Sequence, residues 1–105
     1  METPVAIIVF NRPNLTIEVM NVLRRVKPKH LLVIADGPRS SIEDDVQRCL
    51  AVRQLVDKMI DWDCRVDKNY SDINLGCKRR PETGIDWVFE RVDQAIILEL
   101  SLIHI

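Results

Sequence analysis

The residues best suited to binding a ligand in this sequence follow its apolar runs. Where the runs VAIIVF, HLLVIA and AIIL end, the next polar side chains are amides, acids or guanidinium groups, namely Asn11, Arg12, Asp36, Arg39 and Glu99. A further segment, NLGCKRR, contributes Lys78, Arg79 and Arg80. Carboxylates and amides can form hydrogen bonds to a base and a ribose, and cationic side chains pair with phosphates. Brought together, these residues would suit a nucleotide diphosphate compound.

The apolar pattern predicts the first elements that would hold these side chains. The runs at positions 5–10 and 30–35 are β-branched or apolar almost throughout, which is typical of strands buried on both faces. Between them, Pro13 fits the first turn of a helix, because its missing N–H has no partner to lose there. The expected helix ends before Pro28, and its apolar face consists of Leu15, Val19, Val22, Leu23 and Val26.

The second half of the chain continues the same alternation. Ser41 followed by Asp44 resembles a capping box, so a helix is expected to begin there, with an apolar face formed by Val46, Cys49, Leu50, Val56 and Ile60. A short strand is expected around 64–66 and a polar loop after it. Pro81 is expected to open a third helix before the last strand, AIIL.

This order, with strands that lack a polar face, predicts an α/β fold: a Rossmann-like half, in which a mostly parallel sheet carries helices on both faces. In open parallel sheets, ligands bind beyond the carboxyl ends of the strands. The polar residues that follow the strands are therefore expected to converge on one edge of the sheet.

Composition limits the remaining possibilities. The chain has 105 residues, enough for one domain, and a formal net charge of −1, which predicts no nucleic-acid partner. Its three cysteines form no C-x-x-C pair, and His30 and His104 lack metal-ligand spacing. Its three glycines form no phosphate-binding motif of the Walker or dinucleotide type. No signal peptide or transmembrane segment is evident, so we expect a cytoplasmic protein, free or at the inner face of the membrane.

Five segments in register carry a resemblance to a known family: TPVAIIVFNRPNLT, LLVIADGPR, NYSDINLGCKRR, GIDWVFERV and AIILE. Together they resemble the N-terminal part of a glycosyltransferase of the GT-A fold, in the family-2-like group of bacterial sugar transferases. The resemblance covers positions 3–99. It implies that the parent protein is an enzyme that moves a sugar from a nucleotide diphosphate to an acceptor.

The resemblance also implies roles for individual positions. Phe10, Asn11 and Arg12 match the segment that lines the nucleotide pocket, and Asp36 matches an acid that hydrogen-bonds the base. The positions that match elements near the nucleotide and the donor sugar are Asn74, Gly76, Gly84 and Asp86. Lys78 and Arg79 are expected to bind the diphosphate, because they are positively charged.

In that family, the strand AIILE runs into an acidic EDD motif, whose carboxylates hold Mg²⁺ or Mn²⁺ on the donor diphosphate. Glu99 occupies the first position of that motif, and Leu100 follows it. We therefore expect positions 1–99 to be a partial GT-A nucleotide-sugar-binding domain, truncated after its fourth strand. The divalent cation is expected for the full-length parent, and none is expected to be held by this fragment.

The last six residues, LSLIHI, have a separate explanation. The DNA string CTG-TCT-CTT-ATA-CAC-ATC, the end of a transposon-based library adapter, translates to them in order. Leu100 to Ile105 are thus expected to be adapter read-through and not native. The alternative is a native long strand in a homologue that has lost its metal acids.

These expectations have consequences for activity and association. The chain lacks the acceptor half and the base that it would supply, so no transferase activity is expected from these residues alone. A bare edge of the truncated sheet predicts non-specific self-association. The alternative function is a non-catalytic nucleotide-binding or interaction module on the same fold, because fold alone does not fix function.

Overall fold

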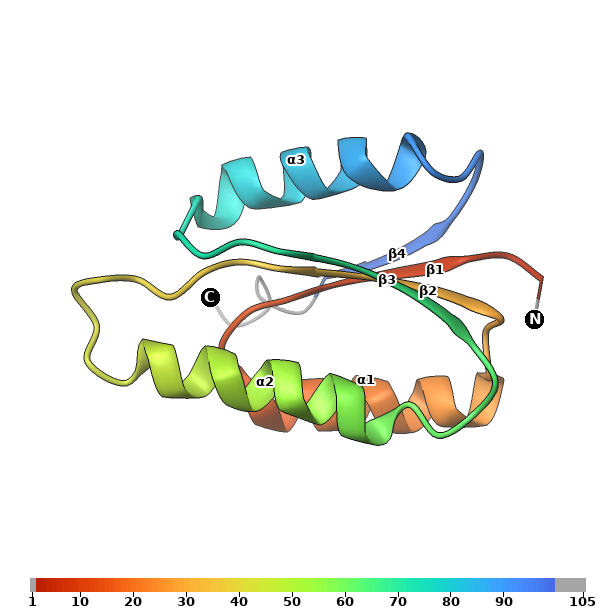
Figure 1. Ribbon diagram of the computed structural model, residues 1–105, viewed down its shortest axis with the longest axis horizontal. Coiled ribbons are helices and arrows are strands. Elements are labelled where there is room, and N and C mark those ends of the chain that lie inside the picture. The colour runs from red at the N-terminus through yellow and green to blue at the C-terminus, as the bar shows by residue number, and fades with distance from the viewer. Residues whose placement is uncertain (1, 100–105) are drawn as a thin grey trace.

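The computed structural model describes residues 2–99 as a sheet covered by helices on both faces, as expected (Figure 1). The elements are β1 (Val5–Val9), α1 (Pro13–Val26), β2 (His30–Ala35), α2 (Asp45–Met59), β3 (Arg65–Tyr70), α3 (Gly76–Phe89) and β4 (Ile96–Glu99). The strand order is β3-β2-β1-β4, and all three strand pairings are parallel. The α/β class predicted from the apolar runs is confirmed.

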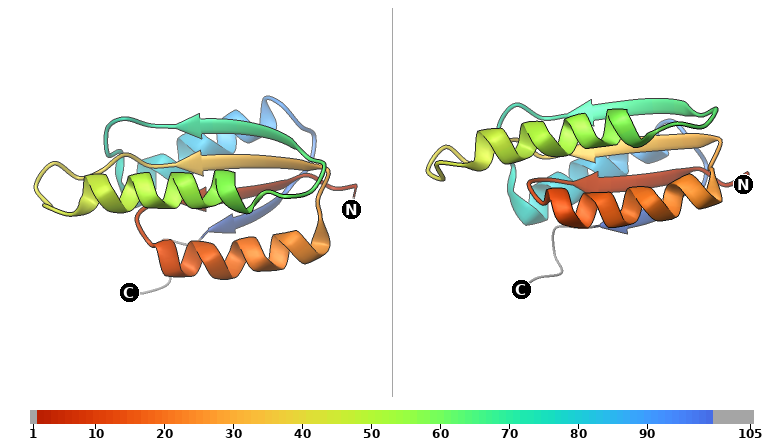
Figure 2. Two further views of the ribbon diagram at one scale, coloured as in Figure 1. Left: turned by 60° about the horizontal axis from the view of Figure 1, so that its bottom comes forward. Right: turned by 90° about the horizontal axis from the view of Figure 1, so that it is seen from below.

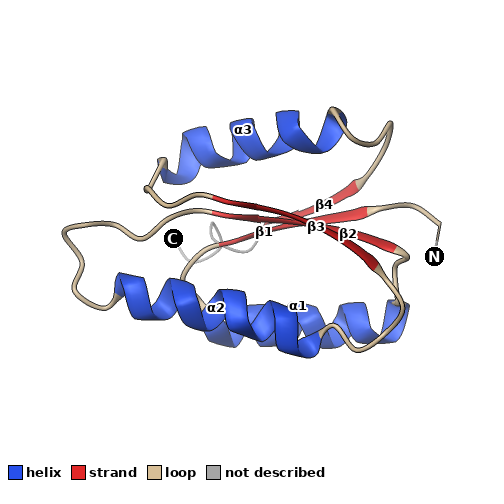
Figure 3. Cartoon of the chain, viewed as in Figure 1, coloured by secondary structure: helices blue, strands red, loops and turns tan. Residues whose placement is uncertain are grey.

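The helices divide unevenly between the two faces of the sheet. α1 and α2 lie side by side below the sheet, and α3 lies above it (Figures 1 and 2). Figure 3 shows the resulting three layers by secondary structure. Every residue of β1 is buried, as are five of the six residues of β2, because these two central strands are covered on both faces. The two central strands therefore carry the core.

A close approach of α3 to the sheet depends on Gly84. A Cβ atom at this position would lie 2.7 Å from Cγ2 of Ile34, which is itself fully buried in β2. Gly84 therefore acts as a packing contact against β2.

Three sequence expectations about element boundaries are wrong. α2 begins at Asp45 and not at Ser41, and its buried stripe consists of Asp45, Cys49, Val52 and Val56. Val46 and Leu50, which we expected on the apolar face, are instead 62% and 54% exposed. The helix is rotated from the expected orientation because the Asp45 side chain is drawn into the interior by a buried ion pair.

The third helix also begins earlier than its proline suggested. α3 starts at Gly76, and Pro81 lies within it. The backbone N–H groups of Leu75 and Gly76 donate to the carboxylate of Asp36, so a residue just after β2 caps the start of the helix. A cap supplied by a distant residue leaves no local signal in the sequence.

The third strand is longer and more polar than expected. β3 spans Arg65–Tyr70, whereas the expected strand ended at Val66 and was followed by a loop. It pairs with β2 from His30↔Arg65 to Ala35↔Tyr70, and no second strand pairs with it within residues 2–99. An edge strand tolerates charged side chains because one of its sides faces solvent. The expectation that all strands lack a polar face is therefore wrong for β3.

Candidate functional site

A pocket of about 320 Å³ opens at the carboxyl ends of β1 and β2, beside the start of α3. This end of the molecule is on the left in Figure 1. The lining residues are Ile8, Val9, Phe10, Asn11, Arg12, Asp36, Arg39, Asn74, Gly76, Cys77, Arg80 and Pro81. Three segments that are far apart in the sequence thus meet where the strand-end argument placed them.

Six of the residues named from the resemblance line this pocket: Phe10, Asn11, Arg12, Asp36, Asn74 and Gly76. Lys78 and Arg79 are exposed on α3 and are not part of the lining. Asp86 is also exposed, roughly 15 Å further along the helix from Gly76 at 1.5 Å per residue. The structure therefore brings the strand-end residues together but leaves the basic pair and Asp86 outside the lining.

The carboxylate of Asp36 holds the segment 74–76 against the end of β2. Its Oδ1 accepts hydrogen bonds from the backbone N–H of Gly37 (2.8 Å) and of Leu75 (2.9 Å). Its Oδ2 accepts from the backbone N–H of Gly76 (3.0 Å) and from Nδ2 of Asn74 (3.2 Å). Asp36 is buried, with only 6% of its surface exposed. Asp36 is thus the anchor of the loop that closes one side of the pocket.

Glycine is required at two places around this anchor. A Cβ atom on Gly37 would lie 2.5 Å from the backbone carbonyl group of Ile73, so the two loops can approach only without a side chain there. Gly76 has a φ of 92°, a conformation that other residues adopt only with strain. Both glycines therefore permit the contact between the loop after β2 and the start of α3.

A second buried carboxylate, Asp45, holds the ends of β1 and β2 from the other face. Asp45 is fully buried and accepts hydrogen bonds from Nδ2 of Asn11 (2.9 Å) and from Arg39, through its backbone N–H (3.0 Å), Nε (2.7 Å) and Nη2 (3.1 Å). These hydrogen bonds hold the pKa of Asp45 well below its usual range. The guanidinium of Arg39 also lies 5.5 Å from the centroid of the Phe10 ring.

The sequence interpretation missed this role of Asp45. The cluster Glu43, Asp44 and Asp45 indicates only a helix start that favours negative charge. Asp45 is the first residue of α2, but its function in the fold is to link the two strand ends. A signal was present: Asp45 lies four residues before Cys49 and seven before Val52, on the buried stripe of the helix. An acid on such a stripe needs a buried partner.

Two arginines grip the ends of β2 and β3 from opposite faces. From α3, Arg80 donates through Nε to the carbonyl oxygen of Ala35 (3.1 Å) and through Nη2 to that of Asn69. From α2, Arg53 donates through Nη2 to the carbonyl oxygens of Ser71 (2.8 Å) and Asp36 (3.2 Å). The Arg53 bonds satisfy carbonyl groups just beyond the ends of the two strands, and the Arg80 bonds satisfy carbonyl groups within their last residues.

Arg80 also adds buried positive charge to the pocket. It is 4% exposed, and burial lowers its pKa, although the guanidinium group remains charged. The acceptors that it contacts are carbonyl, amide and hydroxyl oxygens, and no carboxylate is bonded to it within the described chain. Its charge is thus only partly balanced, by Asp36 nearby.

The amino ends of α1, α2 and α3 all lie at this edge of the sheet (Figure 1). The amino end of a helix carries partial positive charge, and at α3 the carboxylate of Asp36 already accepts from the first N–H groups. Arg12 and Arg39 add two exposed cations, and the two buried carboxylates are occupied by internal hydrogen bonds. The pocket can therefore bind a ligand with an anionic group and with hydrogen-bonding atoms.

Glu99 lies beside the pocket but not in its lining. It is in register with Ile8, which does line the pocket, on the neighbouring strand β4. Its Oε2 atom is buried and has no hydrogen-bond partner among the described residues. Within residues 2–99 no group of three or more His, Cys, Asp or Glu side chains is placed to hold a metal ion. The expected adapter segment, 100–105, lies outside the described residues.

Comparison with known proteins leaves the family open. No family model, no curated protein and no solved structure matches this chain. None of the helices within residues 2–99 has the length and apolar character needed to cross a membrane. The functional case therefore depends on the geometry of the pocket and on the segments that resemble the GT-A family.

Proposed function

We propose that this chain is the donor-nucleotide-binding part of a glycosyltransferase of the GT-A fold. The observation that carries the proposal is the pocket at the carboxyl edge, where six of the residues named from the resemblance line one cavity. A pocket of about 320 Å³ is at the small end of the range for ligand sites. This size suits the nucleotide part of a nucleotide-diphosphate sugar better than the whole donor.

The charges around the pocket support an anionic ligand. Arg12 is exposed at the mouth of the pocket and has no ion-pair partner among the described residues, so it is available to a phosphate. Arg80 contributes buried positive charge from α3. In the parent protein, Mn²⁺ or Mg²⁺ would neutralise charge on the diphosphate, with Glu99 as one of its ligands.

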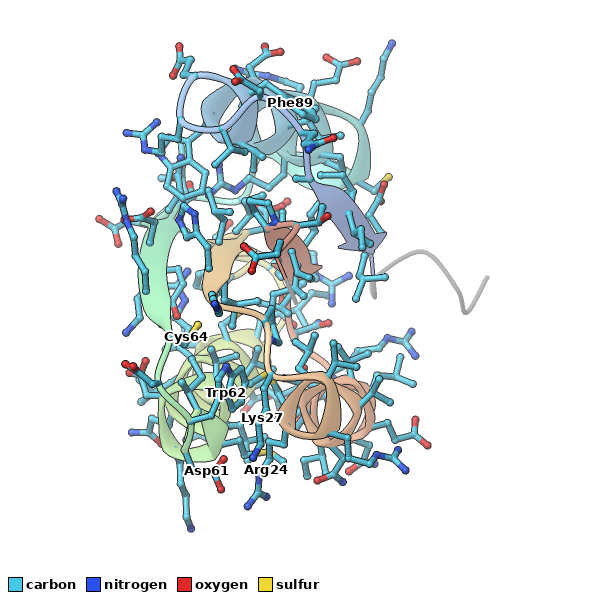
Figure 4. The ribbon with its side chains drawn as sticks, turned by 90° about the vertical axis from the view of Figure 1, so that its right-hand side faces the viewer. Arg24, Lys27, Asp61, Trp62, Cys64 and Phe89 are labelled. Carbon is cyan, nitrogen blue, oxygen red and sulfur yellow. The ribbon has the colours of Figure 1, made fainter. Side chains whose placement is uncertain are left out.

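Calorimetry with a panel of nucleoside diphosphates tests the proposal. We expect UDP or another member of the panel to bind the 105-residue chain. Arg12→Ala should weaken that binding about tenfold, because one charge-assisted contact is lost. Arg25→Ala is the matched control, since Arg25 is an exposed arginine at the opposite end of α1. Figure 4 shows that opposite end, where Arg24 of α1 lies near Asp61.

Two outcomes would count against the proposal. One is the absence of binding for every nucleotide at millimolar concentration, and the other is an equal effect of the two arginine substitutions. Repeating the titration with Mn²⁺ and with a chelator separates the two candidate functions. This chain alone is not expected to hold a cation, but a Mn²⁺ ion carried by the diphosphate would contact Glu99 in the glycosyltransferase, so stronger binding with Mn²⁺ supports that proposal. Binding that is unchanged by Mn²⁺ supports a non-catalytic nucleotide-binding module. With nucleotide sugars and Mn²⁺, we expect no sugar transfer by this chain alone.

A further inference from the structure

The carboxylate of Asp36 has no acceptor position left for a ligand. Each of its two oxygens already accepts two hydrogen bonds, at distances of 2.8 to 3.2 Å. A carboxylate has about four lone-pair sites, so a base could bond to Asp36 only by displacing one of these donors. Three of the four are backbone N–H groups, and leaving one of them unpaired in the interior is costly.

These bonds give Asp36 a different task. Leu75 and Gly76 stand at the first turn of α3, where backbone N–H groups have no partner inside the helix. Asp36 accepts from both of them and places a negative charge at the positive end of the helix dipole. The carboxylate therefore fixes where α3 begins relative to the end of β2.

The same contacts orient the side chain of Asn74, which lines the pocket. Its Nδ2 donates to Asp36 (3.2 Å) and to the carbonyl oxygen of Gly37 (2.9 Å). Both amide hydrogens are thus committed, and this fixes which end of the amide is the oxygen. The Oδ1 atom of Asn74 has no bond within the described chain and remains as an acceptor.

We propose that Asp36 is a positioning residue, and that the group in contact with the base is Oδ1 of Asn74. This inference deepens the proposed function and rests on it. The acceptor would take the imide N–H of a base such as uracil, whereas Asp36 would act only by holding residues 74–76 in place. The resemblance had assigned the base contact to Asp36 itself.

Hydrogen exchange without any ligand tests the positioning role. We expect the amide protons of Leu75 and Gly76 to be protected in the wild-type chain and to exchange at least about tenfold faster in Asp36→Asn, which loses two acceptor positions. Protection in β1 and β2 should persist in that variant. Glu82→Gln removes an exposed charge from the same helix and serves as the control. Unprotected amides at 75 and 76 in the wild type would overturn the positioning role.

Binding measurements then separate a direct contact from an indirect one. The ligands are UDP and its analogue methylated on the imide nitrogen. Because Asp36 also orients Asn74, Asp36→Asn is expected to weaken both ligands and to reduce the preference for UDP, so the contact with the base is decided by the Asn74 variant. Asn74→Ala, in contrast, should abolish that preference while Leu75 and Gly76 stay protected by Asp36.

A preference for UDP that persists in Asn74→Ala and disappears only when Asp36→Asn is added would overturn the inference. If Asp36→Asn does not fold, Asn74→Ala still decides, because retention of the preference in that variant contradicts the assigned contact. Failure of the wild type to bind any nucleotide would count against the proposed function. The exchange measurement would still decide the positioning role in that case.

Discussion

Replacing Asp45 by asparagine would test whether a buried carboxylate joins the ends of β1 and β2. In the wild type, its oxygens accept one hydrogen bond from Asn11 and three from Arg39. Asparagine has the same shape, but an NH₂ group takes the place of one acceptor. That group would face N–H donors, so about two of the four hydrogen bonds are lost, along with the charge.

The expected cost follows from these contacts. A hydrogen bond to a charged group contributes about 1.5–3 kcal/mol, and Asp45 is fully buried. The Arg39 side chain is 44% exposed, so water replaces part of what its guanidinium loses. We therefore expect a loss of about 2 kcal/mol in the free energy of unfolding. For a domain of this size, that corresponds to a fall of roughly 10 °C in Tm.

The effect should depend on pH in a defined direction. Arg39 holds the pKa of Asp45 well below its usual range, so the unfolded chain takes up this proton at a higher pH than the native chain does. The stabilisation is complete above about pH 4, the ordinary pKa of an aspartate, and is lost as the pH falls through the native pKa. The difference between wild type and Asp45→Asn should thus be constant at mildly acidic and neutral pH and shrink below about pH 4.

Thermal unfolding followed by circular dichroism measures these differences. Asp44→Asn is the matched control, because Asp44 is the adjacent acid and its side chain is 65% exposed. Among residues 2–99, its one ion pair is a 3.6 Å contact with Arg48. That control should change the free energy of unfolding by less than about 0.5 kcal/mol. Equal melting temperatures for Asp45→Asn and the wild type at neutral pH would refute the assigned role.

Three further predictions concern the core and the edges of the sheet. Gly84→Ala should lower the free energy of unfolding by about 1–2 kcal/mol in chemical denaturation, because its Cβ would press on Ile34; unchanged stability would contradict this contact. Burial raises the pKa of Tyr70, the single tyrosine, to about 12. The phenolate absorbance of the folded chain should therefore rise near that pH, and a midpoint of this absorbance change near pH 10 would contradict the burial. The chain should self-associate through the edge of β4, as measured by sedimentation velocity. Ile96→Lys in β4 should reduce the self-association, whereas Val46→Lys on α2 should not. A monomeric wild-type chain would contradict this prediction.

The parts of the fold that could be predicted from sequence are those specified by local pattern. The apolar runs of β1 and β2 require burial on both faces, and Pro13 marks the start of α1 correctly. The starts of α2 and α3 could not be predicted, because carboxylates bonded to distant residues set them. The extent of β3 was missed for a related reason: pairing with β2 makes a strand of residues whose own pattern is polar.

The candidate site divides in the same way. That Asn11, Arg12 and Asp36 share one edge follows from parallel strands alone, and the pocket confirms this grouping. Lys78 and Arg79 were included by charge, but their orientation depends on the rotation of α3. That rotation follows from the buried stripe Arg80, Gly84 and Val88, which turns the two preceding residues towards solvent. A charged run thus cannot be assigned to a site before the helix face is known.

The distribution of charge explains why the pocket suits an anion although the whole chain is nearly neutral. Asp36, which lines the pocket, and Asp45, which is bonded to Asn11 and Arg39 of the lining, are both buried and accept hydrogen bonds from internal donors. Arg12 and Arg39 are exposed at the surface, and Arg80 is buried with a charge that is only partly balanced. The lining of the pocket holds three arginines and one aspartate, so this edge of the sheet is more positive than the whole chain, whose net charge is −1. Net charge counted from a sequence cannot reveal this, since it gives buried and exposed acids equal weight.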